Sequence, residues 1–146
     1  MLLPLALLVA QAAPAQACPA PAALPARLAG WRQTAAAPTI GTAFVVTAAD
    51  PETVRGLRIG EVARPGGAAL VPFEVGADAT YRVALSERAW IDVVAGDRVV
   101  KAVAHGHGPA CSGVAKLVDF PLKRGRYALH LTGIGAPSIR VLITRV

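Results

Sequence analysis

The stretch Ala104 to Gly113, AHGHGPACSG, gathers the residues of this sequence that are best suited to chemistry. It holds two of the three histidines and one of the two cysteines. His105 and His107 are two positions apart, so in an extended chain their side chains point the same way and can grip one metal ion together. Two ligands do not make a site, because structural zinc takes four protein ligands and catalytic zinc or non-haem iron typically takes three.

A metal site at this pair needs a third ligand from elsewhere in the chain. The conceivable donors are Asp92, Asp119 and His130, and the divalent metals to consider are iron, copper and zinc. The other interpretation is a glycine-rich connection without a cofactor, whose histidines hydrogen-bond neighbouring backbone groups or face water. The H-x-H spacing favours this second interpretation, because it supplies too few ligands by itself.

Other catalytic arrangements find less support. Ser112 lies in Cys-Ser-Gly-Val and not in a G-x-S-x-G elbow. The nine carboxylates are scattered, and the glycine-rich stretches lack the Lys and Ser or Thr that end a phosphate-binding loop. The residues therefore favour a protein without catalysis of its own.

The start of the chain predicts export. An apolar run from Leu2 to Ala13 precedes Pro14-Ala15-Gln16-Ala17, whose small residues fit an A-x-A cleavage site. We expect residues 1–17 to be a secretory signal peptide and the protein to be periplasmic or secreted. No stretch reaches the roughly 20 apolar residues of a spanning helix, so no transmembrane anchor is expected. Attachment of lipid to Cys18 is less favoured, because the residues before it do not fit a lipoprotein signal.

An exported chain with two cysteines is expected to form one disulfide, Cys18 to Cys111. The chain-entropy model gives a closed loop near 100 residues up to about 4.7 kcal/mol of stabilisation. The bond would hold the Ala- and Pro-rich segment from Cys18 to Arg27 against the histidine-bearing loop.

The charge is basic, with fifteen Lys and Arg against nine Asp and Glu and a formal net charge of +6. The basic residues are scattered, with no run longer than the pair Lys123-Arg124 and without a ladder of interleaved aromatic residues. This pattern argues against nucleic acid as a partner. It is compatible with weak attraction to anionic polysaccharide or lipid head groups.

Period-two alternation predicts short strands over most of the chain, most clearly in Thr80 to Leu85 (TYRVAL). Gly96-Asp97 predicts a hairpin turn, and Gly133 to Pro137 predicts a closing hairpin. The expected strands are Ala43–Thr47, a weaker Leu57–Val62, Leu70–Val75, Thr80–Leu85, Ala89–Ala95, Arg98–Ala104, Val114–Leu122, Arg126–Thr132 and Ser138–Arg145.

About eight short strands without an amphipathic helix predict an all-β fold, an antiparallel two-sheet sandwich or jelly roll. Residues 38–146 are expected to form this domain. The lead-in over residues 18–37 is expected to be extended or to hold a short helical turn at Pro25 to Trp31.

Alternation also places two side chains outside the expected core. Trp90 shares a strand face with Asp92, opposite Ile91 and Val93, which predicts an outward indole. His130 alternates away from the apolar residues of its strand and so lies on the non-core face. Any binding face is expected near the disulfide-tethered loop, and its first candidates are Trp90, Asp92, His105 and His107.

Four stretches in the second half of the chain carry a resemblance. They are Phe73-Glu74-Val75, Gly76 to Leu85 (GADATYRVAL), Trp90-Ile91-Asp92-Val93 and Leu122 to Leu129 (LKRGRYAL). Together they resemble the bacterial pre-peptidase C-terminal type of β-sandwich, whose domains repeat G-x-Y strand openings. That resemblance implies an accessory module of a secreted protein.

A longer pattern adds the signal, the Cys18-Pro19 start, A-W-I-D-V-V, A-H-G-H-G-P-A-C-S-G and V-D-F-P-L-K-R-G-R-Y. It is similar to a group of small exported bacterial proteins of uncertain role, some of which carry a homogentisate 1,2-dioxygenase label. This second resemblance implies oxygenase chemistry for an enzyme built on the histidine pair.

The sequence thus predicts an exported, non-catalytic β-sandwich that acts as a binding or accessory module at the cell envelope. Its expected partner is an envelope glycan, a small molecule or another envelope protein. The alternative is a metal-dependent enzyme that uses His105 and His107, with a dioxygenase of homogentisate type as its specific version.

Overall fold

A computed structural model describes residues 17–58 and 64–146. Nine strands and two short 3-10 helices lie in this part of the chain. They are η1 (Ala26–Arg32), β1 (Phe44–Thr47), η2 (Pro51–Thr53), β2 (Gly67–Val75), β3 (Ala79–Leu85), β4 (Trp90–Ala95), β5 (Arg98–Val100), β6 (Ala104–Gly106), β7 (Lys116–Leu122), β8 (Gly125–Ile134) and β9 (Ser138–Arg145).

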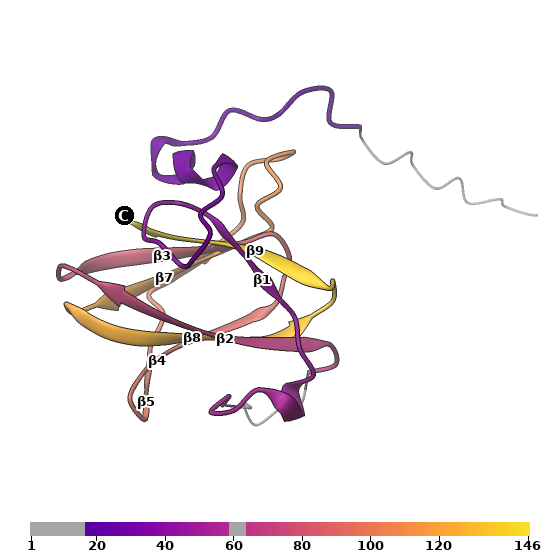
Figure 1. Cartoon of the computed structure of the whole chain (residues 1–146). Helices are drawn as coiled ribbons and strands as arrows, with labels where there is room; N and C mark the ends of the chain where they lie inside the picture. Colours follow the sequence, from indigo (N-terminus) through magenta and orange to yellow (C-terminus); the bar gives the residue numbers. More distant parts are fainter. Residues whose placement is uncertain (1–16, 59–63) are drawn as a thin grey trace, which may run out of the picture.

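The strands form two antiparallel sheets that pack face to face (Figure 1). One sheet has five strands in the order β1-β9-β3-β7-β6, and the other has four in the order β2-β8-β4-β5. The predicted all-β two-sheet sandwich is therefore confirmed. Within the two described ranges, no helix is both long enough and apolar enough to cross a membrane.

Most expected strands are present with small shifts at their ends. The expected strand Leu57–Val62 falls mostly outside the described residues, and Leu57 and Arg58 are not in a strand. The signal peptide predicted for residues 1–17 also lies outside the described residues, apart from its last position.

The prediction of one strand from Arg98 to Ala104 is wrong. β5 pairs with β4 and ends at Val100, and the chain then crosses to the other sheet. There Val103 donates its amide N–H to the carbonyl of Asp119, and β6 pairs with β7. The apolar run is continuous in sequence, but its backbone groups find hydrogen-bond partners in two different sheets.

The closing hairpin predicted at Gly133 to Pro137 is also wrong. β8 pairs with β2 and β4 in the four-stranded sheet, whereas β9 pairs with β1 and β3 in the five-stranded sheet. The connection therefore carries the chain from one sheet to the other. Glycine and proline indicate a change of chain direction, but they do not specify which strand becomes the neighbour.

The inner faces of both sheets supply one apolar core. Its largest fully buried members include Val83, Leu85, Leu129, Ile139 and Ile143. The alternation read from the sequence explains this, because every second residue of a strand points to the same face. Four aromatic residues are buried there as well, namely Phe73, Tyr81, Phe120 and Tyr127.

A second, smaller cluster lies on the outer face of the five-stranded sheet. Figure 1 shows η1 on the side of this sheet that faces away from β2, β8 and β4. Leu28 and Trp31 of η1 pack there against Ala84 and Leu142. The lead-in thus contains one 3-10 helix that is docked on the sandwich.

Close approach of the backbone explains the glycine inside η1. A Cβ atom at Gly30 would lie 1.8 Å from the carbonyl oxygen of Gly41. The main chain of Gly30 also accepts a hydrogen bond from the amide of Ala43, which fastens η1 to the segment that leads into β1. Only glycine allows the two backbones to come this near.

Candidate functional site

The histidine-bearing loop is fastened by several independent contacts. Cys18 and Cys111 form the predicted disulfide, with their Cα atoms 5.6 Å apart. Ser112 donates its hydroxyl to the carbonyl of Pro109 and accepts a hydrogen bond from the amide of Val114. The indole of Trp31 donates to the carbonyl of Ser112. The loop is therefore an ordered part of the scaffold.

His105 and His107 lie at the edge of the five-stranded sheet and line one pocket of about 350 Å³. His105 belongs to β6 and pairs with Val118 of β7. His107 follows the strand, with its Nδ1 atom 3.2 Å from the carbonyl oxygen of Ala115. The structure thus brings the two histidines to one surface, as their spacing predicts.

Two cationic side chains line the same pocket, Arg88 and Lys116. Lys116 donates from its Nζ atom to the carbonyl oxygen of Ala89 over 2.8 Å. Burial of this ammonium lowers its pKa, and the charge of Arg64 lowers it further against an opposing effect of Asp92. Among the residues that the structure describes, no carboxylate lines this pocket.

Trp90 lies beside this pocket. Its side chain is 41% exposed, which agrees with the predicted outward orientation. The guanidinium carbon of Arg64 lies 4.0 Å from the indole ring centroid, and the Nζ atom of Lys116 lies 5.3 Å from it. The Nε1 atom of Trp90 donates to the Asp92 carboxylate over 3.1 Å.

Lys116 therefore joins side chains from both sheets into one surface. Trp90 and Asp92 come from the four-stranded sheet, whereas the histidines come from the edge of the other sheet. We call this surface the basic end, defined by Arg64, Arg88, Trp90, His105, His107 and Lys116. Sequence reasoning missed the three cationic residues, because single Arg and Lys residues occur throughout the chain and only the topology brings these together.

Asp119 does not complete a metal site with the histidines. Its two oxygens accept hydrogen bonds from the Nε and a terminal nitrogen of Arg82, over 2.7 and 2.9 Å. His105 pairs with the neighbouring residue Val118, so the side chains of His105 and Asp119 leave their strands on opposite faces. The Asp119 carboxylate is thus committed to a nearly buried ion pair.

Asp92 and His130 do not complete a metal site either. They are directly opposite each other on β4 and β8, in the four-stranded sheet. Across residues 17–58 and 64–146, no three His, Cys, Asp or Glu side chains gather in a way that could hold a metal ion. The structure therefore brings none of the three conceivable donors into a common group with both histidines.

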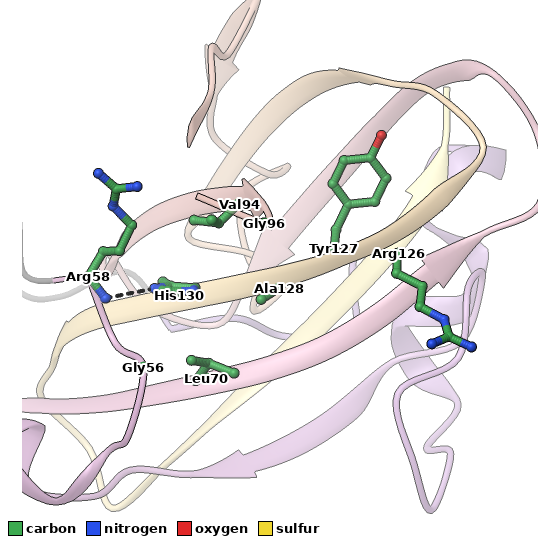
Figure 2. A pocket seen from close by; sticks show the side chains of 9 residues that line it. All are labelled: Gly56, Arg58, Leu70, Val94, Gly96, Arg126, Tyr127, Ala128 and His130. Atoms are coloured by element: carbon green, nitrogen blue, oxygen red, sulfur yellow. Dashed lines mark hydrogen bonds between the residues drawn. The ribbon is translucent and has the colours of Figure 1, made fainter. Parts of the chain in front are cut away.

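His130 has a different environment, which sequence reasoning missed. It lies on the outer face of β8, as predicted, yet it is only 3% exposed. Its Nδ1 atom accepts a hydrogen bond from the backbone N–H of Arg58 over 2.9 Å (Figure 2). Burial lowers the pKa of His130, and Arg58 adds to this effect while Asp92 opposes it.

A second pocket of about 340 Å³ surrounds His130. Its lining includes Leu70, Val94 and Ala128, whose side chains share the outer face of the four-stranded sheet. Arg58 and Arg126 lie at opposite ends of this pocket (Figure 2). The floor between these two arginines is mainly apolar.

No protein-family model matches the chain, and comparisons with the curated proteins and with the solved structures find no match. The assignment of a function therefore depends on the surface chemistry described above.

Proposed function

We propose that the protein is an exported, non-catalytic binding module of the cell envelope, and that it binds an envelope glycan at the basic end. The observation that carries this proposal is the pocket of His105, His107, Arg88 and Lys116 beside an exposed tryptophan. An indole presents a large apolar surface that suits the apolar face of a sugar, and 41% of Trp90 is exposed even with Arg64 over its ring. The carboxylate of Asp92, which holds the indole N–H, also accepts hydrogen bonds from sugar hydroxyl groups.

The support for a binding module is the way in which this surface is built. Trp90 stands on a strand that pairs on both sides, and the pocket is bounded by a loop that a disulfide fastens. Recognition groups on such supports need little ordering when a ligand binds, which favours affinity. The disulfide is compatible with an oxidising compartment and so with export.

The metal-dependent enzyme is the less supported alternative. A catalytic metal centre typically needs three protein ligands, and the described part of the chain gathers no such group around His105 and His107. Both imidazoles instead lie beside cationic side chains, which disfavour a bound metal cation through charge repulsion.

NMR titration of tag-free protein with cellotriose, chitotriose and trigalacturonate tests the proposal. We expect at least one of these sugars to shift backbone amide signals at the basic end. Trp90→Ala should weaken that binding at least about tenfold, which corresponds to the loss of one aromatic contact of about 1.4 kcal/mol.

Val45→Ser is the control, because Val45 is 53% exposed and lies on β1, at the opposite edge of the five-stranded sheet from β6. Its binding should equal that of the unaltered protein. The proposal fails if none of the three sugars binds. It also fails if the purified protein holds stoichiometric iron, copper or zinc that the double variant His105→Ala, His107→Ala loses.

A further inference from the structure

The positive charge of the basic end is only partly balanced within the described part of the chain, where Asp92 beside Trp90 faces the cations Arg64 and Lys116. Three ion pairs occur there, and their basic members are Arg82, Lys123 and Arg126. Neither Arg88 nor Lys116 forms an ion pair in that part of the chain. The pocket that they share with the two histidines is therefore a site of net positive charge, open to a negatively charged group.

Lys116 is the central cation of this site. It is partly buried, and it uses one N–H to bind the carbonyl of Ala89. A lysine ammonium has three N–H donors, so two of them are available to a ligand. Its lowered pKa agrees with this geometry, since burial and the nearby Arg64 disfavour the charged form. A ligand carboxylate beside Nζ would favour the charged form again.

The position of Trp90 beside the pocket indicates which chemical class of anion fits this surface. A small inorganic anion would leave Trp90 without a contact, and a neutral sugar would leave the charges of Arg88 and Lys116 without a partner in the ligand. Lys116 contacts both parts, because it lines the pocket and also lies 5.3 Å from the indole centroid. An acidic sugar offers both matching features, a carboxylate and an apolar ring face.

We propose that the ligand is a glycan that contains uronic acid, with one carboxylate in the pocket between Lys116 and Arg88. His105 has a ring N–H to donate to the same sugar unit, and His107, whose Nδ1–H is directed at the carbonyl of Ala115, accepts a sugar hydroxyl at Nε2. A neighbouring unit lies along the exposed part of Trp90 that Arg64 leaves uncovered. This inference rests on the proposed function and specifies its ligand class. The pocket volume of about 350 Å³ suits one such unit of a longer chain, since ligand pockets start near 300 Å³.

The test is isothermal titration calorimetry with trigalacturonate and with its methyl ester, which keeps the sugar rings and removes the charges. We expect trigalacturonate to bind at least about tenfold more tightly than the ester at low salt. The difference should shrink at high salt, because salt screens exposed charges. Lys116→Gln and, separately, Arg88→Gln should each weaken trigalacturonate binding several-fold and leave ester binding unchanged.

Lys123→Gln is the matched control. Lys123 is an exposed lysine just beyond the other end of β7 from Lys116, about 20 Å away along the strand. The substitution removes one positive charge from the protein, as Lys116→Gln does, but at a residue that does not line the pocket. Trigalacturonate binding should be nearly the same in this variant as in the unaltered protein.

The outcomes separate the two proposals. Equal binding of the acid and its ester, with loss of both in Trp90→Ala, overturns the uronate inference but supports the proposed function. Failure of cellotriose, chitotriose and both galacturonate probes to bind overturns both. Binding to vesicles of anionic phospholipid without binding to trigalacturonate assigns the surface to lipid head groups and also overturns the inference. Far-UV circular dichroism establishes that each variant is folded.

Discussion

Among single residues, His130 shows how a polar group can be stabilising on the outside of a sheet. The ring is buried, and its Nδ1 atom accepts a hydrogen bond from the backbone N–H of Arg58. Because Nδ1 accepts this hydrogen bond, the neutral imidazole is the form that the fold requires. Protonation would place an N–H at Nδ1, where it would face the backbone N–H of Arg58. The positive charge of Arg58 also disfavours protonation, whereas the negative charge of Asp92 favours it.

This arrangement predicts how stability depends on pH. The pKa of His130 in the folded protein lies below its ordinary value of 6.5, so below that value the unfolded chain binds more protons than the folded one. The contribution of His130 is therefore present above about pH 6.5 and is lost as the pH falls through the lowered folded-state pKa. Urea unfolding at pH 8, 7, 6 and 5 should show this decline.

His130→Asn should flatten that dependence, because the amide oxygen can accept from the N–H of Arg58 without titrating. His105→Asn is the control, since it makes the same replacement at an exposed histidine. The same pH slope in His130→Asn and in the unaltered protein would show that another group titrates.

At the scale of elements, η1 shows how a weak local preference is stabilised by packing. A 3-10 helix of seven residues has poor hydrogen-bond geometry and does not persist alone. Here Arg140 of β9 holds its end by donating to the carbonyls of Trp31 and Gln33 and to the hydroxyl of Thr34. The guanidinium also lies 5.6 Å from the ring centroid of Trp31.

Trp31→Ala should therefore destabilise the protein by about 3 kcal/mol, the lower end of the range for buried Trp to Ala changes. The side chain is 5% exposed and also donates to the loop at Ser112, so both packing and a hydrogen bond are lost. Trp90→Ala removes the other tryptophan from an exposed site and should cost less than about 1 kcal/mol. Similar losses in the two variants, measured by urea unfolding, would contradict the docking of η1.

A proline protects one sheet edge from pairing with another chain. β2 is an edge strand, and Ala68 exchanges two backbone hydrogen bonds with Ala49 on its outer side. Pro72 lies four residues further on, so its backbone nitrogen faces the same outer side of the strand. Its missing N–H costs no ladder bond there, and it blocks pairing with another chain.

For the whole molecule, the disulfide joins distant parts of the chain. Cys18 and Cys111 are 93 residues apart in sequence, so the bond restricts most of the unfolded chain. It also closes the contact between the lead-in and the loop that bounds the histidine pocket. Its effect on stability should therefore be large, while its effect on the core between the sheets should be small.

The double variant Cys18→Ser, Cys111→Ser should lose up to about 4.7 kcal/mol in the free energy of unfolding and keep the far-UV spectrum of a β protein. The unaltered protein treated with dithiothreitol should show the same loss, which controls for the serine side chains. If the double variant were as stable as the oxidised protein, the prediction would be wrong. The unfolded chain would then gain little conformational freedom when the disulfide is absent.

The sequence by itself determined the all-β class, most strand positions, the outward face of Trp90 and the disulfide pair. Each of these depends on local alternation or on having just two cysteines, and both can be read directly from the chain. Only the tertiary structure decided that β8 and β9 belong to different sheets, and that the strand predicted from Arg98 divides between both. Strand neighbours are chosen by long-range packing, which turn residues do not encode.

Some residues of the candidate site could likewise be identified from the sequence, and others only from the tertiary structure. His105, His107 and Trp90 could be named from the sequence because their types and spacing are unusual. Arg64, Arg88 and Lys116 could not, since each is an ordinary basic residue that becomes part of the site only where the two sheets meet. The fate of Asp119 also needed the structure, because its partner Arg82 lies 37 residues away and meets it only across paired strands.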